Sequence, residues 1–489
     1  MRLKNLLYAM GLIMFYVGLM LLVPVGVALY YRDYFSVLSF LSAGILSVSI
    51  GFTVRRFIFG DIKPDMLNDI KKTEALFIVA MSWVLFCIIA AVPYLWYGFS
   101  PIDALFEATS GITTTGATIL TDFDYPKAMF FWRSFTQFLG GMGIIVLFIA
   151  VLPQFAVAGR QMFFAEAPVP TEDKLFPRIR NTASALWAVY IGLTVLAAVL
   201  LMCAGMPKFD AVCNAMSTLS AGGFSPNPDS IMGYNSNLIN WIIIAFMFFA
   251  GASFMLQVRV LTQKNPTILF KSEEFRFYTY TVLILALCVS VILYFTHEYD
   301  GFNSITAAIY QVISIATSTG SVAFNYDNWG LSAKIFLFIA MFTGSCAASA
   351  GAGIKMTRWL LVFKTMKAEL FKVLHPNAVI NIKIDNTIVQ ADVLRQIIVF
   401  VFFYFLIFAV SAVLLTLLES NTTIGVSSAI TSLGDIGPGF GGTVGAMGNY
   451  SSLQFASKVI YIFNMLIGRL ELIPFLVFLQ KDFWTIKSN

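Results

Sequence analysis

Runs of about 20 mostly apolar residues recur along this sequence, and no other feature restricts its possible folds as strongly. A helix of that length crosses the hydrocarbon core of a bilayer. Ten candidate spans can be distinguished, at residues 6–30, 36–54, 75–98, 128–152, 183–205, 238–261, 278–296, 334–362, 393–418 and 455–480. Only 12% of the 489 residues are charged and 58% are hydrophobic, far from the balance of soluble domains. The sequence therefore predicts an all-α polytopic membrane protein. The first run is too long for a cleaved signal peptide, so we expect it to be retained.

Basic residues indicate the orientation of the predicted spans. They gather near the N-terminus, in 55–72, 160–180, 259–276 and 355–395, and in the C-terminal tail. Cytoplasmic loops of membrane proteins carry an excess of Lys and Arg. We therefore expect these segments and both termini in the cytoplasm, with the spans in the cytoplasmic membrane. The opposite loops are acidic, which suits the gathering of cations. The net charge of +5 belongs to cytoplasmic loops and does not indicate nucleic-acid binding.

Catalytic and cofactor motifs are absent from the sequence. The five cysteines are scattered without CxxC spacing, and His297 and His375 lie in different loops. The sequence contains neither a nucleophile motif nor a phosphate-binding loop. The loops are also too short for a separate catalytic domain. We therefore expect no enzyme activity and no cofactor on this chain.

Four polar, glycine-bearing turns repeat along the chain. They read TSGITTTGATILTDFD (109–124), MSTLSAGGFSPNPDS (216–230), IATSTGSVAFNYDNW (315–329) and AITSLGDIGPGFGG (429–442). Each follows an amphipathic stretch that would cover only about half a bilayer as a helix. The central glycines, taken as Gly116, Gly222, Gly320 and Gly437, are 106, 98 and 117 residues apart. This spacing predicts a repeat of helix, short helix, turn and helix.

Irregular backbone at membrane depth is tolerated only where it is buried or lines a watery path. Glycine allows backbone angles that can aim successive carbonyl groups toward one axis. Rings of carbonyls can replace the hydration shell of a monovalent cation. The four turns therefore predict an ion filter. Each turn taken alone could be an ordinary surface turn, and residues 438–448 could in part be a flexible outer loop.

The turns TTTGAT, TLSAGGFSP, TSTGS and DIGPG are accompanied by QFLGGMGIIVL (137–147), AEAPVPTEDKLFPRI (165–179), GSCAASAGAGIK (344–355) and NMLIGRLEL (464–472). Together they resemble the TrkH potassium-uptake subunits of the Trk/Ktr/HKT superfamily. The resemblance implies four membrane-pore-membrane repeats in pseudo-fourfold arrangement after an N-terminal two-helix hairpin. The implied units are the hairpin 1–72 and the repeats 73–180, 181–272, 273–390 and 391–489, with filters at 113–117, 219–223, 317–321 and 435–439. It also implies a homodimer and a TrkA-like cytosolic regulatory subunit, with any nucleotide bound by that partner.

The resemblance assigns K⁺ coordination to backbone carbonyls of twelve filter residues. These are Thr114, Thr115, Gly116, Ser220, Ala221, Gly222, Ser318, Thr319, Gly320, Asp435, Ile436 and Gly437. All four filter glycines are present, which favours K⁺ over Na⁺ within the superfamily. Two residues depart from the family pattern. Ser321 stands where an aromatic residue often follows the third glycine, and Asp435 stands where asparagine is common.

The resemblance also implies a gate below the filter. Residues 344–355 place glycines and other small residues inside an expected helix, which predicts a cavity-lining break with Gly351, Gly353 and Lys355 in a movable loop. The alternative is close helix packing of small residues. Arg469 corresponds to the pore-facing arginine of the family and would raise a barrier to cations. Its alternative is an ion pair with Glu471, although positions i and i+2 face apart on a helix.

The sequence therefore favours potassium uptake through a carbonyl filter, regulated from the cytoplasm. A carrier coupled to H⁺ or Na⁺ is an alternative, and it would need an intramembrane carboxylate such as Glu471. A poorly selective K⁺/Na⁺ pathway is another. The basic segment 364–395 could dock the cytosolic partner or contact anionic lipid headgroups.

Overall fold

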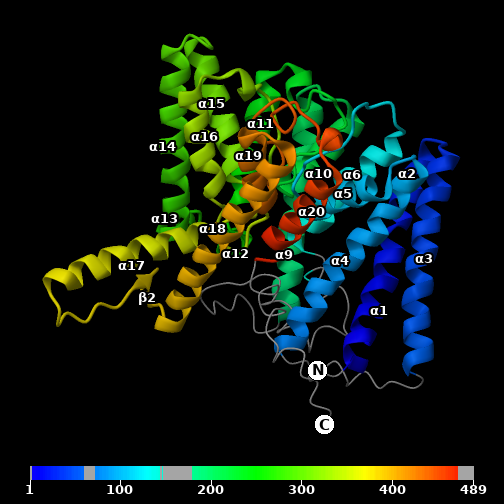
Figure 1. The fold of residues 1–489 in the computed structure, drawn as a ribbon, viewed down its shortest axis with the longest axis horizontal. Coiled ribbons are helices and arrows are strands. Elements are labelled where there is room, and N and C mark those ends of the chain that lie inside the picture. Colours follow the sequence, from blue (N-terminus) through cyan, green and yellow to red (C-terminus); the bar gives the residue numbers. More distant parts are fainter. Residues whose placement is uncertain (1–2, 60–71, 144–145, 147–178, 472–489) are drawn as a thin grey trace.

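The computed structural model describes residues 3–59, 72–143, 146 and 179–471, which form a bundle of helices (Figure 1). Six helical stretches in these residues are long and apolar enough to cross a membrane: Leu6–Tyr30, Tyr34–Val54, Glu74–Trp96, Arg180–Cys203, Glu273–Phe295 and Ala391–Glu419. They coincide with six of the ten predicted spans. The predicted spans 128–152 and 455–480 lie partly outside the described residues, as do the basic segments around 60–71 and 147–178. The total of ten spans therefore stays a prediction.

The N-terminal part is a pair of antiparallel spans. Helices α1 (Leu3–Met20) and α2 (Leu22–Tyr30) form the first, and α3 (Tyr34–Phe59) forms the second. Helix α1 packs along α3 and against α4 (Lys72–Trp96). Glycines from both helices lie at the contact between α1 and α3, where an added Cβ on Gly18 or Gly51 would meet backbone of the other helix. Such small residues let the helix backbones approach closely.

Four short helices each lie in sequence between two other helices of the bundle. The short helices are α5 (Pro101–Ile112), α10 (Lys208–Leu219), α15 (Gly301–Ala316) and α19 (Thr422–Leu433). The helices before them are α4, α9 (Ile179–Cys203), α14 (Glu273–Phe295) and α18 (Ala391–Glu419), and those after them are α6 (Lys127–Met142), α11 (Asn237–Gly251), α16 (Leu331–Phe342) and α20 (Phe455–Arg469). Each short helix packs against both of its neighbours. All four short helices were predicted from the amphipathic stretches.

Local sequence explains where two of the short helices, α5 and α19, begin. The Ser100 hydroxyl accepts a hydrogen bond from Asp103 N at the start of α5, and Pro101 occupies the first helical position. The Asn421 side chain accepts from Ile424 N at the start of α19. Side chains of these types satisfy backbone N–H groups that have no partner within the helix.

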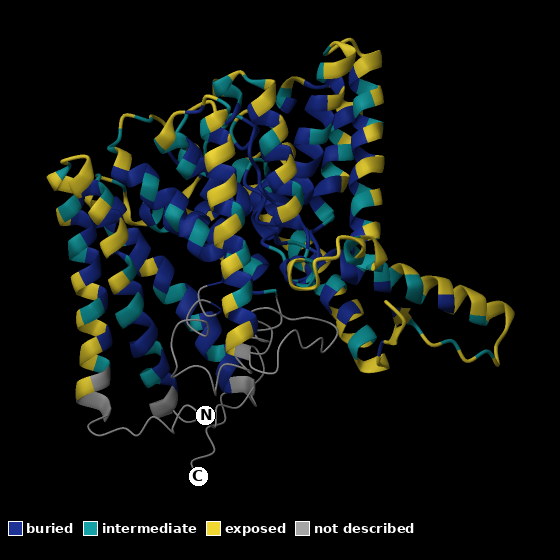
Figure 2. Cartoon of the chain, turned by 180° about the vertical axis from the view of Figure 1, so that it is seen from behind, coloured by how far each residue is buried: buried dark blue, intermediate teal, exposed yellow. Residues whose placement is uncertain are grey.

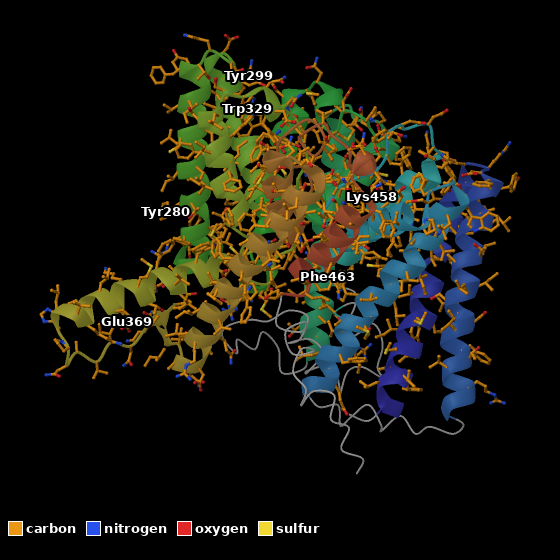
Figure 3. The ribbon with its side chains drawn as sticks, in the orientation of Figure 1. Tyr280, Tyr299, Trp329, Glu369, Lys458 and Phe463 are labelled. Atoms are coloured by element: carbon orange, nitrogen blue, oxygen red, sulfur yellow. The ribbon has the colours of Figure 1, made fainter. Side chains whose placement is uncertain are left out.

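The four helix sets are arranged in a ring. Helix α6 packs on α10, α11 on α15, α16 on α19, and α20 on α5, so the last set returns to the first. Lys458 of α20 (Figure 3) supports the closing contact, because its Nζ lies 2.7 Å from Asp103 Oδ1 at the start of α5. Short one-turn helices, Met232–Tyr234, Tyr326–Asn328 and Tyr450–Ser452, lie in the connections that follow the second, third and fourth short helices.

The outer surface of the bundle is apolar. Figure 2 shows exposed residues along the outward faces of the long helices, whereas buried residues fill the interior. On α14, the exposed side chains include Tyr280 (Figure 3), Leu283 and Leu287. Lipid tails are as apolar as these side chains, so this surface is suited to contact with a lipid bilayer.

The predicted span 238–261 is not one straight helix in the structure. Helices α11 and α12 (Phe254–Gln263) meet at an angle of 96°, with Ala252 and Ser253 between them. The sequence contains no proline at this position, and its Gly-Ala-Ser stretch alone did not predict a break. The freed carbonyls find other partners, since the Gln257 side chain donates to Phe249 O at 2.8 Å and to Ala252 O at 3.3 Å. Helix α13 (Thr267–Lys271) follows.

The interruption predicted at 344–355 is confirmed. Helix α16 ends at Phe342 and α17 (Met356–Leu374) begins at Met356, with a non-helical loop between them. Helix α17 projects from the bundle (Figure 1), and Glu369 lies on the projecting part (Figure 3). Strands β1 (Lys383–Ile384) and β2 (Thr387–Ile388) form an antiparallel hairpin beyond it, with Lys383 opposite Ile388.

Candidate ion pathway

The chain after each short helix follows the same backbone path. We call residues 113–116, 220–223, 317–320 and 434–437 turn segments one to four. In each, the second residue is left-handed: φ is 61° at Thr114, 57° at Ala221, 56° at Ser318 and 49° at Asp435. The fourth is a glycine with positive φ: 81° at Gly116, 74° at Gly223, 68° at Gly320 and 86° at Gly437. Four segments of different sequence thus share one conformation.

The second turn segment corrects the sequence alignment by one residue. The alignment took Ser220, Ala221 and Gly222 as equivalent to residues 114–116, whereas the backbone angles place Ala221, Gly222 and Gly223 there. The double glycine made the register ambiguous. Gly223 is the glycine that needs a positive φ, and Gly222 is a glycine because an added Cβ would lie 2.5 Å from Gln137 Cδ.

The four turn segments close into a ring. An added Cβ on Gly116 would overlap the carbonyl oxygen of Gly222, and one on Gly223 would overlap that of Thr319. Likewise, Gly320 faces the carbonyl oxygen of Ile436, and Gly437 faces that of Thr115. The third residue of each segment therefore presents its carbonyl beside the glycine of the preceding segment. Only glycine leaves room for this approach at a positive φ.

Two side chains that depart from the expected pattern are fully enclosed in this ring. Asp435 is buried, and its Oδ1 accepts a 2.7 Å hydrogen bond from Thr115 Oγ1 of the first segment. Its Oδ2 has no hydrogen-bond partner among the described residues. Ser321 Oγ lies 2.8 Å from Tyr310 Oη of α15, so an aromatic ring reaches this place from the helix.

A hollow opens on the side of the ring that carries the four glycines. It is lined by residues of all four segments or the chain just after them, among them Gly116, Gly223, Gly320 and Pro438. Arg133 also lines it and pairs with Glu107 through a 2.8 Å contact. Both members of this pair are buried. Glu107 and Asp435 therefore do not add to an exposed acidic surface, contrary to the sequence interpretation of the loops.

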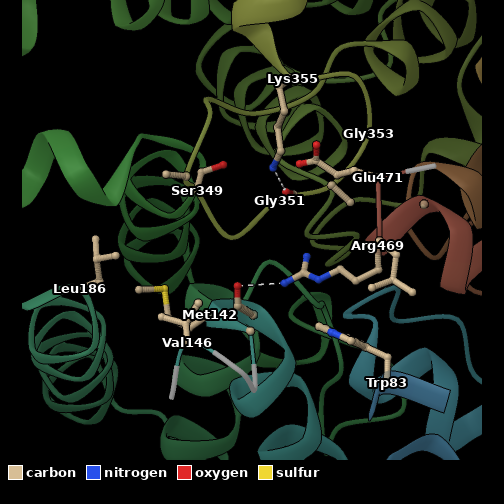
Figure 4. A pocket seen from close by; sticks show the side chains of 16 residues that line it. Trp83, Met142, Val146, Leu186, Ser349, Gly351, Gly353, Lys355, Arg469 and Glu471 are labelled. Carbon is tan, nitrogen blue, oxygen red and sulfur yellow. Dashed lines mark hydrogen bonds between the residues drawn. The ribbon is translucent and has the colours of Figure 1, made fainter. Parts of the chain in front are cut away.

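A second hollow lies beyond the C-terminal ends of α6 and α20 (Figure 4). It is lined by Gly141–Gly143, by parts of the loop 343–355 and by 468–471. The predicted gate residues Gly351, Gly353, Lys355 and Arg469 all line it. The structure thus brings these four residues together at one place.

Arg469 connects the loop 343–355 to the end of α6. Its guanidinium donates to Ala350 O at 2.8 Å, to Gly140 O at 2.6 Å and to Gly141 O at 2.9 Å. Glu471, the alternative partner, forms its ion pair with Arg358 of α17. Lys355 donates to Gly351 O within the loop (Figure 4), rather than to a neighbouring helix.

The loop 343–355 reaches the third turn segment and also pairs with the break between α11 and α12. Ala352 N donates to Ser318 Oγ at 2.8 Å, which joins the loop to the ring. Three backbone hydrogen bonds join it to the break: Cys346 N to Gly251 O, Ala350 N to Ala250 O, and Phe254 N to Ala348 O, at 2.9, 3.2 and 2.9 Å. Sequence reasoning did not predict this pairing, because it took 238–261 as one helix.

A half-buried carboxylate holds the loop from the other side. Glu274, at the start of α14, accepts a 2.6 Å hydrogen bond from Ala347 N and another from Thr357 Oγ1 of α17. The sequence contained one usable signal, an acidic pair at the beginning of an apolar helix. Within the described residues, no three His, Cys, Asp or Glu side chains are grouped to hold a metal ion.

Comparison with known proteins shows which family the chain belongs to. A sequence model of the TrkH family, described as cation transport protein, matches residues 59–485. The chain belongs to this family. The Trk system potassium uptake protein TrkH of Salmonella typhimurium is 37% identical over 85% of this chain and 87% of its own length. The protein of the same name from Halomonas elongata is 32% identical over 99% and 100%.

A solved structure is also similar throughout. The crystal structure of the potassium transporter TrkH from Vibrio parahaemolyticus aligns with a TM-score of 0.87 and 30% identity, covering 99% of this chain and all of that one. Together with the apolar helices, membership of the TrkH family makes this chain a membrane protein with a transporter fold.

Proposed function

We propose that this chain takes up K⁺ across the bacterial cytoplasmic membrane through a filter of backbone carbonyls at the four turn segments. The observation that carries the proposal is the closed ring in which each segment presents a carbonyl beside the glycine of its neighbour. Carbonyl rings of this kind can replace the hydration shell of a monovalent cation without a charged side chain. The similar proteins of Salmonella and Halomonas are named as potassium uptake proteins, which supports K⁺ as the ion.

In this proposal, the ion passes from the hollow lined by the glycines, through the ring, to the hollow lined by Arg469. The loop 343–355 and the Arg469 guanidinium act as the gate, because together they line the second hollow and are joined by a hydrogen bond. Movement of the loop requires the hydrogen bonds from Arg469 and from Ala352 to break. We further propose a homodimer with cytoplasmic termini and a TrkA-like cytosolic subunit that binds the regulating nucleotide and acts on the gate. The chain itself needs no cofactor.

Flux measurements on the purified chain in liposomes test the proposal. We expect K⁺ influx down a K⁺ gradient to exceed Na⁺ influx down a matched Na⁺ gradient, and to follow the membrane voltage. Equal flux of both ions would contradict a K⁺ filter and favour the poorly selective pathway. Absence of flux, both alone and with the cytosolic subunit and nucleotide, would reject the proposal.

A coupled K⁺ carrier is the second candidate, and one observation favours it. Asp435 has a buried carboxylate oxygen at the ring, and this oxygen has no hydrogen-bond partner among the described residues. Such a group could carry a proton with the ion. The other carboxylate considered for coupling, Glu471, is already paired with Arg358. Coupling predicts that a pH gradient alone drives K⁺ uptake, and that Asp435→Asn abolishes this response while leaving voltage-driven flux.

A further inference from the structure

Turn segments one and three are supported by hydroxyl groups of their own short helices and of the segments themselves. A serine two residues before the end of the short helix donates to the residue after the glycine: Ser110 Oγ to Ala117 O at 2.6 Å, and Ser314 Oγ to Ser321 O at 2.7 Å. Two threonine hydroxyls also pair within each segment, Thr113 with Thr115 at 2.7 Å and Thr317 with Thr319 at 2.8 Å. These two segments lie on opposite sides of the ring.

Turn segment two lacks this support. Ser217 occupies the serine position, but its hydroxyl has no hydrogen-bond partner among the described residues. Instead, the fully buried Gln137 of α6 reaches the segment from outside. Its Nε2 donates to Gly222 O at 2.6 Å, and its Oε1 accepts from Phe224 N at 3.2 Å. The amide thus binds the segment at two points, and one of them is a carbonyl of the ring.

Turn segment four is held by side chains that follow it in its own repeat, not by its short helix. Thr431 occupies the serine position, but its hydroxyl donates within α19 and pairs with Tyr461. The hydroxyl of Tyr450, in the connection beyond the segment, donates to Gly437 O at 2.6 Å. The hydroxyl of Tyr461 in α20 donates to Tyr450 Oη at 3.0 Å and lies farther, at 3.4 Å, from Gly437 O. Both tyrosines are buried.

We propose that Gln137 and Tyr450 are positioning residues that determine ion specificity, by fixing the carbonyls of the two segments that their short helices do not support. This inference rests on the proposed filter. A carbonyl without such a donor can rotate away from, or toward, a smaller ion, so the ring loses its preference for the larger one. All four segments share one backbone conformation, but the hydrogen bonds that support them alternate between two patterns around the ring. Losing either donor, Gln137 or Tyr450, widens the range of ions that the ring accepts.

Two conservative variants test the inference, Gln137→Met and Tyr450→Phe. The readout is the K⁺/Na⁺ permeability ratio from reversal potentials in liposomes, which a general loss of stability does not change. We expect each variant to lower the ratio about tenfold, the scale set by one lost buried hydrogen bond. The matched control is Ser47→Ala, which removes another buried hydroxyl-to-carbonyl bond, from Ser47 Oγ to Met14 O at 2.7 Å, within the N-terminal helices. We expect the control to keep the ratio of the unchanged chain.

The outcomes separate this inference from the proposed function. If the unchanged chain shows no preference for K⁺, the proposed filter itself fails. If the unchanged chain prefers K⁺ and both variants keep its ratio, the filter stands and the inference is overturned. A fall of the same size in Ser47→Ala also overturns it. Tyr450→Phe removes a single oxygen atom, so it decides the matter if Gln137→Met cannot be purified.

Discussion

The ring of turn segments and the loop 343–355 are neighbours built on opposite principles. In the ring, four unrelated short sequences adopt one backbone conformation, and each glycine faces a carbonyl of the next segment. The loop separates α16 from α17, and its surroundings are charged. The charged side chains in and around it are Arg469, Lys355, Glu274, Glu471 and Arg358. A ring that surrounds an ion needs equivalent sides. A barrier needs no such symmetry, and this one contacts the ring at turn segment three, through Ala352 N and Ser318 Oγ.

The largest expected effect is a loss of function from a Cβ in the ring. In Gly320→Ala, the new methyl would overlap the carbonyl oxygen of Ile436 at a φ of 68°. The left-handed conformation alone costs an L-residue about 1–2 kcal/mol. We therefore expect K⁺ flux to fall to the level of empty liposomes and the thermal midpoint to drop.

Gly330→Ala is the matched control for that variant. Gly330 lies in the same repeat, has a negative φ, and has open space where a Cβ would stand. We expect it to transport normally. Selective K⁺ flux through Gly320→Ala at the rate of this control would show that the ring is not the ion path.

The next effect concerns the barrier. Arg469→Gln removes a positive charge and most of the contacts that join the loop to Gly140, Gly141 and Ala350. Each hydrogen bond to a charged group contributes about 1.5–3 kcal/mol. We expect K⁺ influx through the chain without its partner to rise at least about tenfold, since 1.4 kcal/mol corresponds to that factor. The measurement is influx with and without the cytosolic subunit, and unchanged influx in both conditions would remove Arg469 from the gate.

The difference between the two regions also explains what the sequence could predict. The four short helices and the glycine turns recur with nearly constant spacing, so periodicity was enough to locate them. Turn segment two was displaced by one residue, because two adjacent glycines serve different purposes, one sterically beside Gln137 and one for its φ. The break between α11 and α12 was missed altogether. Its carbonyls are satisfied by Gln257 and by the loop 343–355, and such distant partners leave no local signal in Gly251 or its neighbours.

Glu274→Gln tests whether the Glu274 carboxylate holds the loop 343–355, and we expect a smaller effect than that of Arg469→Gln. The amide keeps an acceptor for Ala347 N or Thr357 Oγ1 but loses the negative charge. We therefore expect a rise of a few-fold in basal K⁺ influx, below that of Arg469→Gln. A second readout is the rate at which a thiol reagent modifies Cys346, which is 1% exposed within the loop. On a background without Cys203 and Cys288, we expect faster modification in the variant. Equal rates would show that Glu274 does not hold the loop.

The smallest expected effect comes from the ion pair between Lys364 of α17 and Glu273 of α14. Both side chains are 32% exposed, and pairs in such positions contribute about 0–1 kcal/mol. Lys364 also donates to Lys383 O, so Lys364→Gln loosens the hairpin from the bundle without touching the loop. If the loop is held by its buried contacts, neither basal influx nor the modification rate of Cys346 changes in this variant. A rise in influx comparable to that of Glu274→Gln would mean that the projecting helix α17 itself controls the gate. The gate region would then include α17 as well as the loop 343–355.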